Sequence, residues 1–164
     1  TINSSNPMQL TTFQPAVAVG EPRWYVANLF RVLVSNEQTD GAYSLLEMTL
    51  RQGFEPPAHF HEREDEAFCV LEGRMRFYLD GEEFVANAGE AVFLPRLVPH
   101  SFRVDTMTAR VLLLLTPGEF ARFFINVSEE APAYVLPAIP QGPPPPHVLD
   151  AIRAESAAFG IQYV

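Results

Sequence analysis

Cysteine, basic residues and long apolar runs are all scarce in this chain of 164 residues. The single cysteine, Cys69, cannot close an intrachain disulfide, so packing must hold the fold, and nothing points to an oxidising compartment. The longest apolar run, Val111 to Leu115, is far shorter than the roughly 20 residues of a membrane helix. The stretch from Thr1 to Thr12 is polar and lacks the pattern of a signal peptide. We therefore expect no membrane association and a cytoplasmic location.

Positive charge is the second deficit. The chain has 11 basic and 20 acidic residues, which gives a formal net charge of −9. Such a protein repels polyanions and offers no basic stripe for a phosphate backbone, so nucleic-acid binding is excluded as its main function. With 48% hydrophobic and 19% charged residues, the composition is that of one folded globular domain.

Short apolar or alternating runs, broken by turn residues, fill the chain from Trp24 to about Thr116. This pattern is typical of an antiparallel sandwich or barrel. The clearest turn is Asp80-Gly81, because this pair supplies the positive φ angles of a two-residue hairpin. We predict an all-β domain over residues 23–118. Its expected strands are residues 25–33, 42–50, 66–72, 74–79, 83–86, 91–94, 100–104 and 109–115.

The ends of the chain have a different character. We expect an N-terminal segment, residues 1–22, and a C-terminal extension, residues 119–164, whose phenylalanine-rich start predicts a short helix or turn. The proline run at residues 141–146 is stiff and extended, which indicates a spacer rather than a ligand for other proteins. Residues 147–159 have helical apolar spacing, and Gly160 stands where a helix C-cap is expected. The sequence therefore predicts a short helix that the spacer lays on the domain.

Three of the four histidines accompany one glutamate in a pattern that indicates a metal site. His59 and His61 are two residues apart, so in an extended strand they face the same side. Glu66 opens the next apolar strand, and His100 begins another. Buried imidazoles and carboxylates without partners are costly, and one divalent cation would supply a partner to all four. The alternative is that these are surface histidines without a metal.

The spacing of these residues resembles the first of the two motifs of the cupin superfamily. That motif reads glycine, five residues, His-x-His, three or four residues, glutamate, six residues, glycine. Every fixed position is matched, by Gly53, His59, His61, Glu66 and Gly73.

The second cupin motif reads glycine, five residues, proline, one residue, glycine, two residues, histidine, three residues, asparagine. Gly89, Pro95 and His100 match it, whereas Leu97 replaces the turn glycine and Val104 replaces the asparagine. Neither departure removes a ligand, so only the geometry of the turn after Pro95 is open.

Residues 56–73, 98–100 and 116–118 resemble small bacterial single-cupin proteins related to quercetin 2,3-dioxygenase. The resemblance implies a cupin jelly-roll β-barrel, often dimeric, with one divalent transition metal that can be Fe, Mn, Ni, Co, Cu or Zn. The ligands that it implies are His59, His61, Glu66 and His100. In a dioxygenase, Glu66 would also act as the base that takes a proton from an enolic or phenolic substrate, which then reacts with O2.

Two other classes of function stay open: a metal-dependent isomerase or hydrolase of a small sugar or keto acid, and a small-ligand binder without catalysis. The inward faces are mostly apolar, which favours an aromatic substrate, although Phe68, Val70 and Phe102 are interpreted as core. We expect Cys69 to be a buried structural thiol and His147 to be solvated. Edge strands favour a homodimer, which a monomeric mass in light scattering would contradict.

Overall fold

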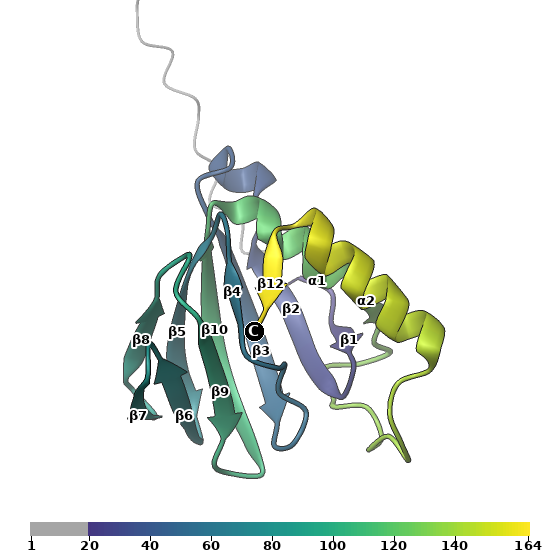
Figure 1. The fold of residues 1–164 in the computed structure, drawn as a ribbon. Helices are drawn as coiled ribbons and strands as arrows, with labels where there is room; N and C mark the ends of the chain where they lie inside the picture. The colour runs from purple at the N-terminus through teal and green to yellow at the C-terminus, as the bar shows by residue number, and fades with distance from the viewer. Residues whose placement is uncertain (1–19) are drawn as a thin grey trace, which may run out of the picture.

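The computed structural model describes residues 20–164 and folds them into two antiparallel sheets that face each other (Figure 1). The larger sheet has seven strands in the order β11-β1-β2-β3-β10-β5-β8, and the smaller has five in the order β12-β4-β9-β6-β7. The predicted all-β jelly-roll barrel with a short C-terminal helix is confirmed. The predicted N-terminal segment lies largely outside the described residues.

The strands of the larger sheet are β1 (Arg23–Tyr25), β2 (Asn28–Val34), β3 (Ser44–Arg51), β5 (Asp65–Glu72), β8 (Ala91–Leu94), β10 (Thr108–Thr116) and β11 (Glu129–Glu130). Those of the smaller sheet are β4 (His59–His61), β6 (Arg74–Leu79), β7 (Glu82–Asn87), β9 (His100–Val104) and β12 (Ile161–Tyr163). The helices are η1 (Glu37–Thr39), η2 (Gly118–Phe120), α1 (Ala121–Asn126) and α2 (Pro146–Ala158). None of the helices within residues 20–164 is long and apolar enough to cross a membrane.

The core lies between the sheets and follows the period-two pattern of the sequence. On β10, which pairs with both β3 and β5, Ala109, Val111, Leu113 and Leu115 are buried, whereas the residues between them are partly exposed. Aromatic rings of the two sheets meet across the core, with Phe68 from β5 5.4 Å from Phe102 of β9, between ring centroids. Burying each such apolar side chain contributes about 1.5–3 kcal/mol to folding.

The first strand of the sheet differs from the sequence prediction. The strand expected at residues 25–33 is divided into β1 and β2 by a tight turn at Val26 and Ala27, across which Tyr25 pairs with Asn28. Val26 adopts a φ of 56°, which is rare for a β-branched residue. Because valine is not a typical turn residue, the sequence does not indicate a turn at this position. By contrast, the Asp80-Gly81 turn is confirmed, with φ values of 49° and 81°.

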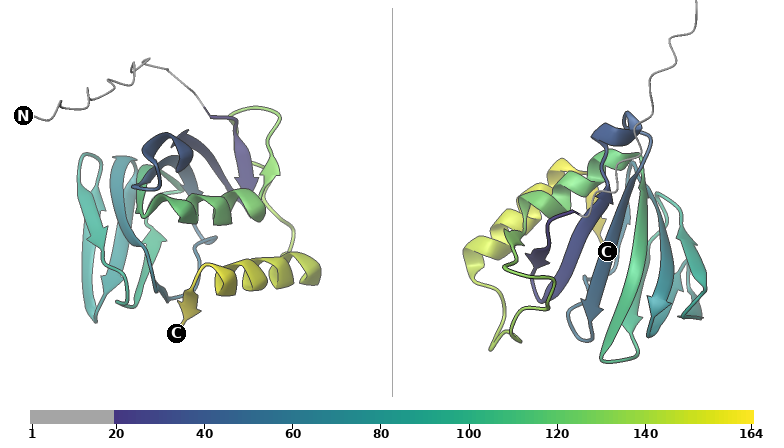
Figure 2. Two further views of the ribbon diagram at one scale, coloured as in Figure 1. Left: turned by 90° about the horizontal axis from the view of Figure 1, so that it is seen from above. Right: turned by 180° about the vertical axis from the view of Figure 1, so that it is seen from behind.

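The C-terminal extension packs along the open side of the barrel. Helices α1 and α2 lie side by side there, as the view from above shows (Figure 2). The predicted terminal helix is confirmed as α2, and Gly160 follows it with a φ of 74°. The chain then forms β12, which pairs with β4 so that Ile161 lies opposite His61 and Tyr163 opposite His59. The last strand is therefore bonded directly to the strand that carries two of the predicted ligands.

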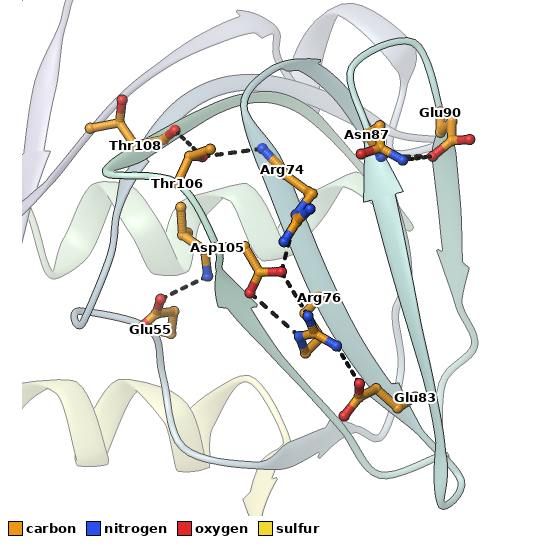
Figure 3. A network of polar contacts seen from close by, with 10 residues as sticks. Glu55, Arg74, Arg76, Glu83, Asn87, Glu90, Asp105, Thr106 and Thr108 are labelled. Carbon is orange, nitrogen blue, oxygen red and sulfur yellow. Dashed lines mark hydrogen bonds and ion pairs between the residues drawn. The ribbon is translucent and has the colours of Figure 1, made fainter.

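A polar network holds the far end of β9 and the loop that precedes β4 (Figure 3). The Asp105 carboxylate accepts hydrogen bonds from Arg74 Nε at 3.2 Å and from Arg76 Nη2 at 3.0 Å, and Arg76 also pairs with Glu83. Glu55 Oε1 accepts the backbone N–H of Val104 at 2.8 Å. Because Glu55 lies shortly before β4 and Val104 ends β9, this bond fixes the loop that leads into the first histidine.

Candidate metal centre

The structure brings all four predicted ligands into one buried cluster. His59, His61, Glu66 and His100 each offer a ligand atom, and these atoms lie within 4.8 Å of one another. Glu66 Oε2 is 3.5 Å from His61 Nε2 and 3.4 Å from His100 Nε2. The cluster has the composition, three imidazoles and one carboxylate, that suits a divalent first-row metal.

Strand pairing explains how the cluster forms. On β4 the side chains alternate, so His59 and His61 are buried while Phe60 between them is partly exposed. His100 lies directly opposite His59 on the neighbouring strand β9. Glu66 comes from β5 in the other sheet, on the same inward face as Phe68. The cluster therefore bridges the two sheets.

Backbone carbonyls orient two of the imidazoles. His59 Nδ1 lies 2.8 Å from the Pro57 oxygen, and His100 Nδ1 lies 3.1 Å from the Val98 oxygen. A carbonyl can only accept, so the proton sits on Nδ1 and the lone pair of Nε2 faces the cluster. Burial also lowers the pKa of His59 to about 4, which keeps this ring in the neutral, metal-binding form at pH 7.

The carboxylates of the site have opposite tendencies. Burial opposes ionisation of Glu66, but attraction to the charge of His61 and polar contacts with His100 and His61 outweigh burial and hold the pKa of the Glu66 carboxyl well below its usual range. Glu64, on the turn before β5, is also buried, and burial raises the pKa of its carboxyl. Glu66 is thus an anionic ligand candidate at neutral pH.

Unpaired buried atoms support the fit to a metal ion. Among the side-chain atoms of residues 20–164, those buried without a hydrogen-bond partner include both ring nitrogens of His61 and Nε2 of His100. Buried polar atoms normally have a hydrogen-bond partner. A bound metal ion would supply the partner that these nitrogens lack. Two ligand atoms about 2.1 Å from one ion lie about 3.0–3.5 Å apart. The separations of 3.4 and 3.5 Å from Glu66 Oε2 fall in that range, so the residues fit a divalent transition metal.

A cavity of about 60 Å³ borders the cluster, and His59, His61 and Glu66 form part of its wall. Most of the remaining wall is apolar or aromatic. Phe68 and Phe102, interpreted from the sequence as core, line the cavity, whereas Val70 is buried elsewhere in the core.

Two cavity residues were not recognised from the sequence. The Phe120 ring of η2 lies 4.7 Å from the His61 ring, and the Tyr163 ring of β12 lies 6.1 Å from the His59 ring, between centroids. Both come from the C-terminal extension, which no local motif connects to the histidines.

Two residues to which the sequence analysis assigned no functional role lie away from the cluster. Cys69 is half-buried, so the expectation of a fully buried thiol was wrong. It faces away from the core because it alternates with the buried Phe68 and Val70. His147 is exposed at the start of α2, as expected.

Leu97 keeps the turn that the second motif builds with glycine. Its φ is 65°, in the left-handed region, and its backbone N–H donates to the His61 oxygen at 2.8 Å. The turn thus supports the strand that carries His61, even though the residue type is unfavourable there.

We expect Leu97→Gly to stabilise the protein by about 0.5–1 kcal/mol. Relief of a left-handed leucine is worth about 1–2 kcal/mol, and the greater chain entropy of glycine offsets about 0.5–1 kcal/mol of it. Urea unfolding would measure the change. Leu97→Ala is the control, because alanine keeps the Cβ, and the leucine side chain that it removes is 63% exposed. Equal stability of the two variants would contradict the prediction.

Comparison with known proteins identifies a region of the chain that includes all four residues of the cluster. Residues 46–117 match the family model described as the cupin domain. Quercetin 2,3-dioxygenase of Bacillus subtilis is 30% identical over 113 residues, which cover 69% of this chain and 34% of that protein. The chain spans 34–55% of the length of the curated relatives that it matches.

Solved structures show the same fold at low identity. A nucleoside dehydratase from Streptomyces is 18% identical with a TM-score of 0.53, over 68% of this chain and 88% of the other. A predicted oxalate decarboxylase from Thermotoga maritima is 22% identical with a TM-score of 0.53, over 60% of this chain and 93% of the other. At these identities the likeness concerns the fold alone.

Proposed function

Because the chain contains a cupin domain, we propose that it is a metal-dependent, dioxygenase-like oxidoreductase that acts on an aromatic or enolic small molecule with O2. The observation that carries this proposal is the burial of three imidazoles and one carboxylate beside an apolar cavity. A first-row divalent ion held by His59, His61, Glu66 and His100 would supply a redox-active centre with open coordination positions. Similarity to quercetin 2,3-dioxygenase over 113 residues supports the reaction class.

Glu66 is the residue that would move a proton. It lies in the cavity wall and is ionised at neutral pH, so it could take the proton of a bound hydroxyl whose acidity a metal ion would raise. A substrate hydroxyl placed beside it would become an electron-rich enolate or phenolate, which is the form that reacts with O2. Phe68 and Phe102 would hold a flat ring and exclude bulk water.

The size of the cavity favours a second candidate. At about 60 Å³ it is much smaller than the roughly 150 Å³ cavity that holds benzene in an engineered protein. A flavonol is larger than benzene and would fit only if the wall of the cavity moved outward. The alternative is a metal-dependent isomerase or hydrolase of a small sugar or keto acid, or a binder of such a ligand.

Elemental analysis of the purified protein, followed by oxygen consumption with quercetin under the metal found, tests the proposal. We expect about one redox-active ion per chain and oxygen uptake in the wild type, and loss of both in His59→Ala and Glu66→Ala. Stoichiometric zinc without oxygen uptake would favour the second candidate. A wild type that contains no metal would contradict the proposal of a metal site.

A further inference from the structure

A second carboxylate lies behind the metal cluster. Glu64 stands in the turn between β4 and β5, where Glu62 and Arg63 are exposed, yet its own exposed fraction is only 4%. Its Oε2 atom lies 3.8 Å from Nδ1 of His61. Neither atom has a hydrogen-bond partner. A buried carboxylate without a partner is costly, so its place beside this nitrogen requires an explanation.

The other two histidines show what is missing at His61. His59 and His100 each direct Nδ1 at a backbone carbonyl, at 2.8 and 3.1 Å, and thereby point Nε2 into the cluster. His61 has no such carbonyl, and Glu64 occupies the corresponding position on the Nδ1 side of its ring. Glu64 does not belong to the group of atoms that could share one ion. It therefore faces the imidazole from behind rather than the metal.

We propose that Glu64 is a positioning residue for His61: its carboxylate accepts a hydrogen bond from Nδ1–H of His61 when a metal ion is bound, and so presents the Nε2 lone pair to the ion. This inference rests on the metal site proposed above. When Nε2 binds a cation, the proton must be on Nδ1, where the carboxylate is its nearest acceptor. A carboxylate acceptor also makes the imidazole a stronger donor to the ion than a backbone carbonyl does.

Titration of Co(II) into chelator-treated protein, in competition with a chromophoric chelator, measures the contribution of Glu64. We expect Glu64→Gln, which keeps an acceptor but loses the charge, to bind Co(II) about 10-fold more weakly, and Glu64→Ala about 100-fold more weakly. Glu62→Gln is the matched control, because it removes the same charge from an exposed side chain two residues away and should bind as the wild type does.

Two further measurements separate positioning from a structural role. In proton NMR of the Co(II) protein, the three imidazole N–H groups of the cluster should give shifted exchangeable signals, and Glu64→Ala should lose the one from His61 by exchange with water. The melting temperature of metal-free Glu64→Gln should be no lower than that of the wild type, because the carboxyl that it replaces has a buried Oε2 without a hydrogen-bond partner. Unchanged Co(II) affinity with all three signals retained would overturn the proposal, as would equal weakening by Glu62→Gln. A wild type that binds no Co(II) would overturn the metal site as well.

Discussion

Replacing His61 with alanine is expected to lower metal affinity several hundredfold and to remove metal-dependent stabilisation. A four-ligand zinc site contributes about 10–16 kcal/mol, which averages about 2.5–4 kcal/mol for each ligand, or about 70- to 900-fold in affinity. His61 is the most enclosed of the three histidines, at 1% exposure, and it contacts Glu66 on one side and the Phe120 ring on another. Alanine offers no ligand atom, so the site would keep only three of its four candidate protein ligands.

Thermal unfolding with and without metal measures this loss directly. At a free metal concentration of 100 times the dissociation constant, the wild type gains about 2.7 kcal/mol, or about 5–11 °C for a domain of this size. The His61→Ala protein should show no such rise at the same concentration. His147→Ala is the control, because it removes the exposed histidine of α2 and should keep the full rise. A His61 variant that still gains the same stability would show that the metal binds elsewhere.

The ligand cluster was predictable because local geometry determines most of it. Two histidines two residues apart on a strand face the same side whatever the rest of the fold does. Glu66 is the second residue of β5 and His100 the first of β9, and both side chains are buried. The spacing of the two motifs then assigns these four residues to one site. At Leu97, where the motif has glycine, the chain adopts a φ of 65° in the left-handed region that glycine favours, and the backbone N–H of Leu97 donates to the His61 oxygen.

The surroundings of the cluster were not predictable in the same way. Phe120 and Tyr163 reach the histidines only because the chain returns to the barrel 59 and 102 residues after His61, and no spacing rule covers such distances. Glu64 stands in a run of charged residues, where an exposed side chain is the ordinary expectation. The turn that holds Glu64 also packs against the C-terminal extension, since Gly160 and Ala158 lie against Glu62 and Arg63, and no local pattern reveals that contact.

Gly73→Ala is expected to destabilise the protein by about 2–5 kcal/mol, whereas Gly53→Ala should do so by only about 1–2 kcal/mol. The two glycines close the ends of the first motif and have nearly the same backbone, with φ values of 82° and 86°. Alanine in this left-handed region costs about 1–2 kcal/mol at either position. Gly73 has a second constraint, because a Cβ there would lie 2.6 Å from the Thr108 oxygen and 2.7 Å from Thr106 Oγ1.

The neighbours of Gly73 cannot move aside freely. Thr106 Oγ1 already donates to the Thr108 oxygen and accepts the N–H of Arg74, so relief of the clash breaks bonds at the start of β6 and β10. Overpacking of this kind adds about 1–3 kcal/mol. At Gly53 no atom lies within 4 Å of the added Cβ. Urea unfolding of the two variants therefore separates the two physical reasons for a motif glycine, and equal losses would mean that the backbone angle alone explains both.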